Sequence, residues 1–530
     1  MKKLKLFVIL SLLIGTMFAF GACGGDELTV PMGWEINEEN TLTWEEVTDA
    51  RSYVVEVKNV ADGTITELSP RKEEADLSKL EEGDYEIKIK AVGDGDVYKD
   101  SDWSETFAFH KDYETGCIYT SINNDTAYEI TKVGKAKGVV LIESLYRGKP
   151  VTRIADSAFK GSTKITEVVI GDNVEYIGER AFYNCSKLTK ITIPESVTTI
   201  GPFAFQSCRV LNNVELPSSI TEIGEATVAY CRGLTQIEIP DSIVTLGDSA
   251  FADCSALVTI DIPDSVTSIG QDAFSGDKAL TTVTMSDNVT TIPANAFYNC
   301  SALATFNFGE TNKLTSIGEF AFTNCVALKS LTIPEGVKSI GERAFYMAEN
   351  FETVDLPSTI TSIGSEAFND TKLYANVVDA GGSYIYADNW IVGCTNTTKE
   401  SLAEIRQETW AGTNVVGIAD TVFLGTPNLQ KVYLPYSIKY IGNRAFYGCE
   451  ALSRLEFADN SVETIGDFAF AYCTELDQVN MGNSLKTIGS YAFYGCEDLK
   501  NNDLGDPLIP ASVTIIIADT RYTVGDFYTR

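Results

Sequence analysis

The sequence predicts a repeat solenoid, with a parallel in-register sheet and short helical turns, preceded by a small all-β sandwich. Three observations carry this prediction. The chain has 530 residues, too many for one compact core. An Ala-Phe pair recurs along it at a spacing that is almost always 23 residues. Before the repeats, short runs of alternating apolar and polar residues are separated by turn residues.

The Ala-Phe pair defines the repeat. Its phenylalanine stands at positions 159, 182, 205, 251, 274, 297, 322, 345, 368, 446, 470 and 493. Val228 fills the gap between Phe205 and Phe251 in register, and Phe423 stands 23 residues before Phe446, which gives fourteen units. Such self-similarity at a fixed period is the signature of a repeat architecture.

Each repeat contains two hydrophobic periods. Ile191 and Ile193 alternate with polar residues, as in a strand with one buried face, and Pro194 ends that strand because it cannot donate a ladder hydrogen bond. The following Ile-Gly-x-x-Ala-Phe-x-x-Cys stretch spaces its apolar residues by three or four. This spacing predicts a short helical turn that returns the chain, with a glycine such as Gly201 supplying the bend.

One coil of this length cannot bury its own apolar face, so neighbouring coils must stack and form a continuous core. We expect the array over residues 151–516, with an island at 369–422 where the Ala-Phe anchor is missing. Both ends of a solenoid expose an apolar cross-section. Residues 111–150 are therefore predicted as linker and N-terminal cap, and residues 517–530 as C-terminal cap.

The full motif reads Leu-x-x-Ile-x-Ile-Pro-x-x-Val-x-x-Ile-Gly-x-x-Ala-Phe-x-x-Cys, as between Leu188 and Cys208. This motif resembles the bacterial surface leucine-rich repeats called BspA-like, and the match covers roughly residues 117–516. The resemblance implies a leucine-rich-repeat solenoid on a cell surface that binds extracellular or host-surface proteins, in adhesion to a host or a neighbouring cell.

Residues 23–110 are predicted to form a tether and the β-sandwich. Pro31, Trp44 and Tyr53, followed by the Leu-x-x-Gly-x-Tyr sequence from Leu80 to Tyr85, resemble a fibronectin type III module with its tyrosine corner.

Residues 1–22 read as an export signal, with three early lysines, an apolar run and small residues before Cys23. The segment resembles a lipoprotein signal peptide, which implies that Cys23 carries a lipid and holds the protein on the outer face of a membrane. The alternative is ordinary signal cleavage with Cys23 as an incidental thiol. No later stretch has eighteen uninterrupted apolar residues, so contact with the membrane is expected only through this lipid.

Composition argues against several kinds of chemistry. The single histidine, His110, lies between the predicted sandwich and the array and is interpreted as a linker residue, so catalytic residues and metal ligands are predicted as none. The glycines recur singly rather than in phosphate-binding clusters, and no cofactor is expected. A formal charge of −33 repels phosphate backbones, so nucleic acid is not an expected partner. Acidic residues are too numerous for counting to exclude a pair of carboxylates of the kind that hydrolyses glycosides.

The cysteines follow the repeat. Of 12 in the chain, nine lie three residues after an anchor position: Cys185, Cys208, Cys231, Cys254, Cys300, Cys325, Cys449, Cys473 and Cys496. Neighbouring coils stack ~4.8 Å apart, whereas a disulfide needs Cβ atoms ~3.8 Å apart, so we predict a ladder of buried free thiols. Cys117 and Cys394 lie outside this ladder and stay undecided.

The polar face of the sheet is the predicted binding surface. One row of it contains Thr192, Glu215, Glu238, Asp261, Thr284, Asn307, Thr332 and Asp355. Threonine suits an exposed strand without any ligand, but three acids on successive coils ~4.8 Å apart repel one another unless they splay, which a basic partner or cation relieves. A merely solvated acidic patch is the alternative interpretation.

Tyrosines that follow the anchor phenylalanine are a second candidate interface, at Tyr183, Tyr298, Tyr346, Tyr447 and Tyr494, together with Tyr433, Tyr436 and Tyr440. Packing of the ring over the core edge explains them as well, and we favour it. A passive structural stalk and a glycan-capturing accessory lipoprotein are the competing functions.

Overall fold

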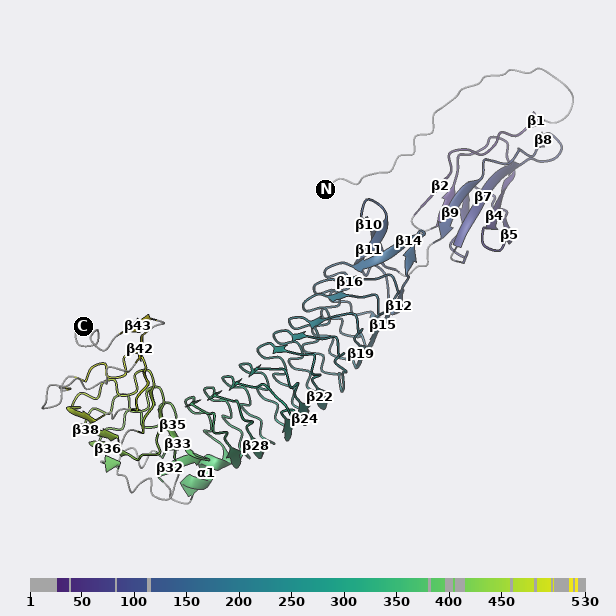
Figure 1. Ribbon diagram of the computed structural model, residues 1–530. Coiled ribbons are helices and arrows are strands. Elements are labelled where there is room, and N and C mark those ends of the chain that lie inside the picture. Colours follow the sequence, from purple (N-terminus) through teal and green to yellow (C-terminus); the bar gives the residue numbers. More distant parts are fainter. Residues whose placement is uncertain are drawn as a thin grey trace. The chain divides into compact units, whose positions relative to one another are not determined.

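The computed structural model describes residues 26–37, 40–81, 83–111, 116–379, 383–395, 404–405, 415–457, 461–480, 484–496, 499, 514–517 and 520–522. The chain divides into two compact units, Met1–Tyr113 and Glu114–Arg530 (Figure 1). The predicted export signal and Cys23 lie outside the described residues. Within the described ranges, no helix combines the length and apolar character needed to cross a bilayer.

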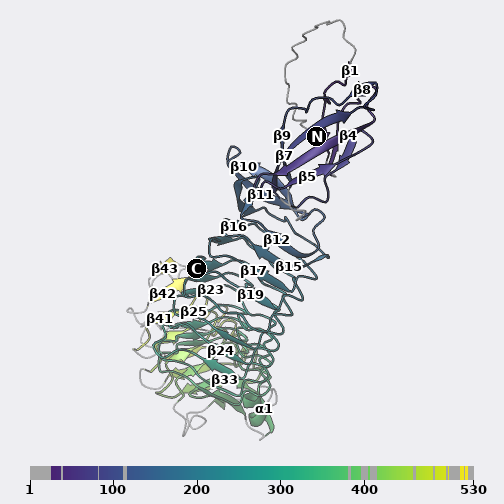
Figure 2. The ribbon, with the colours of Figure 1, turned by 90° about the vertical axis from the view of Figure 1, so that its right-hand side faces the viewer.

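The N-terminal unit is built from two antiparallel sheets and a short parallel pair, and Figure 2 shows the four strands of the larger sheet. The four-stranded sheet has the order β5 (Ile65–Leu68), β4 (Ser52–Asn59), β7 (Gly83–Val92), β9 (Phe107–Lys111). The three-stranded sheet has the order β2 (Glu35–Ile36), β3 (Thr41–Thr43), β6 (Glu74–Asp76), and β1 (Asp26–Glu27) pairs β8 (Tyr98–Lys99).

The core of this unit combines aliphatic side chains with a few aromatic ones. The rings of Trp44 and Tyr53 meet edge to face at 5.1 Å, and both side chains are buried. The hydroxyl of Tyr85 donates to the carbonyl oxygen of Glu81 at 2.8 Å, four residues upstream. A buried tyrosine thus fastens the connection that leads into β7.

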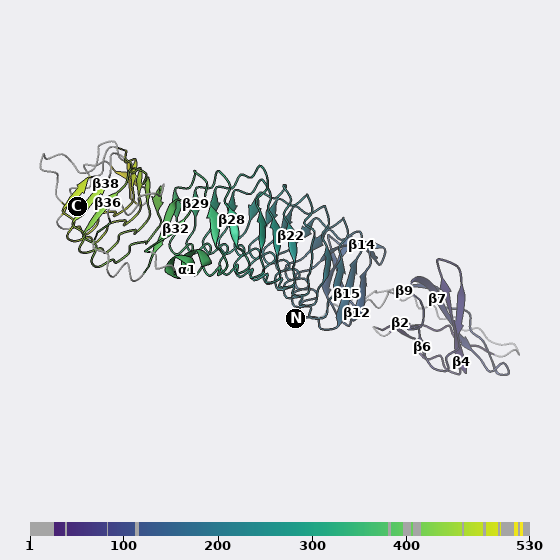
Figure 3. The ribbon, with the colours of Figure 1, turned by 90° about the horizontal axis from the view of Figure 1, so that it is seen from below.

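In the second unit, the Ile-x-Ile segments form parallel in-register strands that we call ladder A (Figure 3). The predicted solenoid is confirmed, although ladder A is interrupted. Its segments are β12 (Gly138–Ile142), β15 (Ile165–Ile170), β17 (Lys190–Thr192), β19 (Asn213–Glu215); then β22 (Thr259–Asp261), β24 (Thr282–Thr284), β26 (Thr305–Asn307); then β28 (Ser330–Thr332), β30 (Thr353–Asp355); then β34 (Glu404–Ile405), β36 (Lys431–Leu434), β38 (Arg454–Phe457), β40 (Gln478–Asn480).

A second set of strands, ladder B, is formed in most coils by the two residues that directly precede the glycine of the motif. Its first two segments are β10 (Ile118–Ile122), β11 (Ala127–Lys132), β14 (Lys149–Ile154), β16 (Tyr176–Ile177), β18 (Thr199–Ile200), with β13 (Leu145–Tyr146) beside β14; and β20 (Glu222–Ile223), β21 (Thr245–Leu246), β23 (Ser268–Ile269). The third is β25 (Thr291–Ile292), β27 (Ser316–Ile317), β29 (Ser339–Ile340), β31 (Ser362–Ile363).

The island of the sequence continues ladder B. α1 (Lys372–Asp379) is followed by an antiparallel pair, whose second strand joins the next coil in parallel. The order is β32 (Tyr384–Ala387), β33 (Trp390–Cys394), β35 (Gly417–Ile418), β37 (Tyr440–Ile441), β39 (Thr464–Ile465), β41 (Thr487–Ile488), β42 (Thr514–Ile517), β43 (Thr520–Tyr522). One buried cluster runs from Ile130 to Phe493, so the core is continuous across the island.

The return segment of each coil consists of successive single turns. The N–H of Ala181 donates to Gly178 within the coil, whereas the N–H of Phe182 donates to Ala204 in the next coil at 2.8 Å. Arg180 and Asn184 have positive φ, at 54° and 56°, and the same two places recur along the array. The chain therefore reverses through left-handed residues and bonds to its neighbour at alternate residues.

The expected role of the glycine is wrong. Gly201 does not have positive φ and supplies no special bend. A Cβ atom on it would lie 2.6 Å from the backbone nitrogen of Glu179 in the preceding coil. Glycine is needed here because two coils approach too closely for a side chain, which a single coil of sequence does not reveal.

Phenylalanines and cysteines fill the inside of the return segment. The anchor rings stack between coils, for example Phe251 on Phe274 at 5.3 Å. Each ladder thiol donates to a carbonyl of the preceding coil, as Cys208 Sγ does to Phe182 at 3.1 Å. Among the described residues, from Cys117 to Cys496, no cysteine is part of a disulfide. The prediction of buried free thiols agrees with this arrangement.

Candidate functional site

The structure separates the predicted binding row into parts. Thr192 and Glu215 pair in register on β17 and β19. Asp261, Thr284 and Asn307 pair in register on β22, β24 and β26. Glu238 is exposed, but its coil, between β19 and β22, has no assigned ladder A strand. Asp355 lies farther along on β30 and accepts a hydrogen bond from Thr332 at 3.0 Å.

The break after Asn307 has a cause in the sequence. The anchors Phe297 and Phe322 are 25 residues apart, two more than the usual period. The extra residues lie directly after β26, in the segment that contains Glu310 and Thr311. The longer coil therefore carries an additional turn at the C-terminal end of the ladder A strands.

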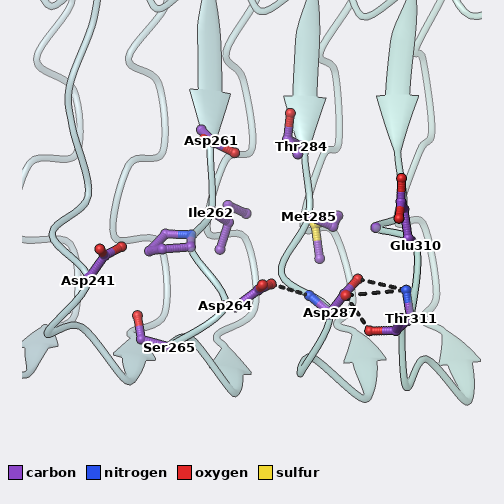
Figure 4. Close-up of a pocket in the computed structure, with 12 residues that line it drawn as sticks. Asp241, Asp261, Ile262, Asp264, Ser265, Thr284, Met285, Asp287, Glu310 and Thr311 are labelled. Carbon is purple, nitrogen blue, oxygen red and sulfur yellow. Dashed lines mark hydrogen bonds between the residues drawn. The ribbon is translucent and has the colours of Figure 1, made fainter.

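At this end of β22, β24 and β26 lies an open groove of about 680 Å³, the acidic groove (Figure 4). It is lined by Asp241, Asp261, Ile262, Pro263, Asp264, Ser265, Thr284, Met285, Asp287, Gly309, Glu310 and Thr311. Of the sequence-predicted residues, Asp261 and Thr284 line the groove. Thr192, Glu215, Glu238, Asn307 and Asp355 do not.

Two of the carboxylates are fixed in a chain along the coils. Asp264 accepts a hydrogen bond from the backbone N–H of Asp287 at 2.8 Å. Asp287 in turn accepts bonds from the backbone N–H and the hydroxyl of Thr311. Figure 4 shows these bonds along the lower edge of the groove. They hold the two side chains in place, so their charges are preorganised.

The other three carboxylates face solvent without such support. Among the described residues, no hydrogen bond or ion pair is recorded for the carboxylates of Asp241, Asp261 and Glu310. The ammonium of Lys313 in the longer coil donates a hydrogen bond to the side-chain oxygen of Asn288, at 2.7 Å. Five acidic side chains therefore line one groove without a paired cation from the described chain.

A serine hydroxyl adds a donor at the base of the groove. Ser196 and Ser219, at the same place in their coils, donate to the carbonyl oxygens of Val174 and Val197. The hydroxyl oxygen of Ser265 is buried and has no such partner in the described structure. The groove thus combines carboxylate acceptors with the hydroxyls of Ser265, Thr284 and Thr311.

The sequence held a signal for the residues that the predicted row missed. Asp241, Asp264, Asp287 and Glu310 are each 23 residues apart, so they form a second acidic row. Each lies three residues after a member of the predicted binding row. Reading only the strand positions overlooks this row. The two-residue insertion after β26 marks where the groove lies.

The second candidate, the tyrosines after the anchors, is divided by exposure. Tyr183, Tyr346 and Tyr447 are partly buried, as packing predicts. Tyr298 and Tyr494 are exposed, at 41% and 52%. Packing over the core edge therefore accounts for only part of this set.

The stacked coils with their parallel ladders and consensus leucine positions define a leucine-rich-repeat solenoid. The family described as BspA type Leucine rich repeat region (6 copies) matches residues 152–281, 267–396 and 404–516. The chain belongs to this family. Solenoids of this family are typically not enzymes.

Solved structures with the same repeat are similar to this chain. A leucine-rich repeat protein from Bacteroides ovatus is 27% identical, covering 74% of this chain and 93% of its own, with a TM-score of 0.45. A leucine rich cell surface protein from Faecalibacterium prausnitzii is 24% identical, covering 76% and 89%, with a TM-score of 0.28. The pneumococcal vaccine antigen PcpA is 18% identical, covering 75% and 93%, with a TM-score of 0.20. A search of curated proteins finds no match to the chain.

Proposed function

We propose that the protein acts on the surface of a bacterium and binds another protein through the acidic groove. The observation that carries the proposal is the convergence of five carboxylates in a groove without a paired cation. The family model and the printed descriptions of a cell surface protein and a vaccine antigen among similar structures support a surface role.

The chemistry of the groove favours a cationic segment of the partner. Asp264 and Asp287 are already oriented, so lysine or arginine side chains gain charge-assisted bonds with little reordering. Asp241, Asp261 and Glu310 add further negative charge to the same groove, and a basic partner neutralises it. Extracellular or host-surface proteins are the proposed partner class, and adhesion the proposed role.

We further propose that Cys23 carries the lipid that holds the protein on the outer face of a membrane. The basic start, apolar run and small residues before Cys23 support this. The N-terminal unit is proposed as a fibronectin type III-like module, because it has four-stranded and three-stranded sheets and a tyrosine bonded four residues upstream.

The anchoring proposal predicts a change of location. Replacing Cys23 with Ala removes the lipid acceptor, so the protein is expected in the culture medium and not in the membrane fraction of the expressing bacterium. Immunoblots of both fractions measure this. A membrane-bound Cys23→Ala protein contradicts lipid anchoring.

The binding proposal is tested by capture on a panel of extracellular-matrix, mucin and bacterial surface proteins, with and without calcium. The groove variant is Asp241→Asn, Asp261→Asn and Glu310→Gln. The control variant, Glu195→Gln, Glu335→Gln and Asp355→Asn, removes the same number of charges outside the groove. Saturable capture lost only in the groove variant supports the proposal. Equal binding by both variants overturns it, and silence on every panel favours a passive stalk.

A further inference from the structure

Ladder A begins at the edge of a sheet. β12 is the first strand of this sheet and has one strand partner among the described residues, β15 (Figure 3). The backbone N–H and C=O groups on the other side of β12 therefore have no strand to pair with in the described part of the chain. Such an edge is a template for a further strand, and proteins commonly protect it with charged side chains or a covering segment.

The outward side chains of this edge strand are apolar instead. Val139 is 64% exposed and Leu141 is 47% exposed, whereas Val140 and Ile142 are buried in the core. Leu145, three residues after the strand, is also exposed. The terminal coil of a solenoid normally has a polar outer face, because it lacks a neighbour to cover it. An apolar outer face on the first strand therefore indicates a surface for contact with another molecule.

The apolar character is confined to the start of the ladder, and the same outward positions become polar in the following coils. In register along the sheet, Leu141 is followed by Val169, Thr192 and Glu215, and Val139 by Glu167, Lys190 and Asn213. Strand propensity alone does not explain this pattern, because the inner strands of the sheet form with polar residues at these positions.

The sequence of β12 is complementary to itself. When two copies of the strand pair antiparallel about Val140, Val139 of each copy lies opposite Leu141 of the other, on the outward face. Just beyond the strand, Lys137 comes opposite Glu143 of the other copy. Among the described residues, no salt bridge is recorded for Lys137 or Glu143. Two-fold symmetry makes each of these cross-strand pairs occur twice.

One register satisfies both kinds of pair. Centring the pairing on Val139 places Lys137 opposite Leu141, and centring it on Leu141 places Val139 opposite Glu143. Each of these sets a charged side chain against an apolar one. A register between two residues opposes outward side chains to inward ones. The pairing about Val140 is therefore specified by the residues themselves.

We propose that two copies of this protein associate through β12, in a symmetric antiparallel pair centred on Val140. The contact adds strand hydrogen bonds at the free edge, lets the apolar outward side chains cover one another, and forms two pairs of Lys137 with Glu143. Ladder A of one copy then continues into ladder A of the other. The acidic groove takes no part in this contact, so the inference does not depend on the proposed function.

Sedimentation velocity from about 1 µM to about 200 µM tests this on the Cys23→Ala protein, in which no lipid on Cys23 can associate the copies. A reversible equilibrium of monomer and dimer is expected. Lys137→Glu and Glu143→Lys are each expected to weaken the dimer about tenfold, because like charges then oppose each other on both sides of the axis. An equal mixture of the two variants is expected to restore the dimer, since unlike charges again face each other.

Val139→Thr with Leu141→Thr is a second test, which keeps strand-favouring residues but gives β12 the polar outward face of the inner coils, so it should also weaken the dimer. Lys338→Glu is the matched control, because Lys338 is exposed and directly precedes β29, away from β12. Its dimer should equal that of the unchanged protein, and circular dichroism checks that each variant is folded.

Three results overturn the proposal. The first is a protein that stays monomeric at every concentration. The second is a dimer that Lys338→Glu weakens as much as Lys137→Glu does, or that the two threonines leave unchanged. The third is a folded mixture of Lys137→Glu and Glu143→Lys that stays monomeric.

Discussion

Asp277 is an exception in the cysteine ladder. It stands three residues after the anchor Phe274, where its neighbours in register are Cys254 and Cys300. The side chain is 0% exposed, and neither carboxyl oxygen has a hydrogen-bond partner in the described structure. Burial, followed by the nearby charge of Asp253, raises the pKa of Asp277 well above 3.8. The buried acid is therefore neutral over a wider pH range than an exposed one.

This predicts that Asp277→Cys raises the free energy of unfolding by an amount that depends on pH. The folded-state pKa of Asp277 exceeds its unfolded value, so its presence costs stability as pH rises above about 3.8 and costs least below that pH. The cysteine variant restores the ladder donor and is expected to be more stable at pH 7 by about 1–3 kcal/mol. Thermal unfolding at pH 4 and pH 7 measures the difference. A gain that is the same at both pH values contradicts this account.

The ladder thiols make a second prediction at this scale. Burial raises the pKa of Cys231 to about 12, so little reactive thiolate forms at pH 8. The native protein is expected to resist alkylation by iodoacetamide, and the non-reduced, unfolded protein to be alkylated at every ladder position. Mass spectrometry of the digested protein counts the modified sites. Disulfide-linked ladder peptides contradict the prediction.

At the scale of the element, the return segment sets the spacing between coils. Its left-handed residues and its hydrogen bonds at alternate residues are set by the next coil, which one repeat of sequence does not show. The spacing of apolar residues by three or four therefore predicted a helical turn instead. The strand of ladder A was predictable from Ile191 and Ile193, because alternation requires no knowledge of the next coil. The two-residue strands of ladder B could not be predicted, because two residues are too few to show an alternation of apolar and polar side chains.

The glycine in this segment gives a matched pair of substitutions. In Gly201→Ala the Cβ meets the backbone of Glu179 at 2.6 Å, whereas in Gly224→Ala the nearest atom, Thr227 Oγ1, lies 3.6 Å away. We expect Gly201→Ala to lower the free energy of unfolding by about 1–3 kcal/mol, and Gly224→Ala to change it little. Chemical denaturation of both variants tests this. Equal loss in the two would show that coil contact is not the reason for glycine.

The candidate site shows the same limit of sequence reasoning. Asp261 and Thr284 were predicted because they occupy outward positions of a strand. Asp241, Asp264 and Asp287 follow the strand, in a turn whose direction the period does not give. The longer coil before Phe322 was visible as a spacing of 25, but only the structure shows that its extra residues meet the acidic row.

At the scale of the whole molecule, the repeated coils provide a large surface, and the candidate binding site lies where the repeat is irregular. Identical coils would present uniform rows along ladder A. The coil of Glu238, which has no ladder A strand, and the longer coil with Glu310 each break that uniformity. The acidic groove lies at these breaks, and the core is continuous through them.

The central claim is that the acidic groove, and not acidity in general, captures a cationic segment. Isothermal titration calorimetry with a lysine-rich peptide, at low and at physiological salt, tests it most directly on the wild type and on the two variants of equal charge described above. The account predicts that the groove variant binds at least about tenfold more weakly than the control variant and loses much of the salt dependence. Equal weakening in both variants would contradict the claim, because the chain's total charge of −33 would then account for the binding.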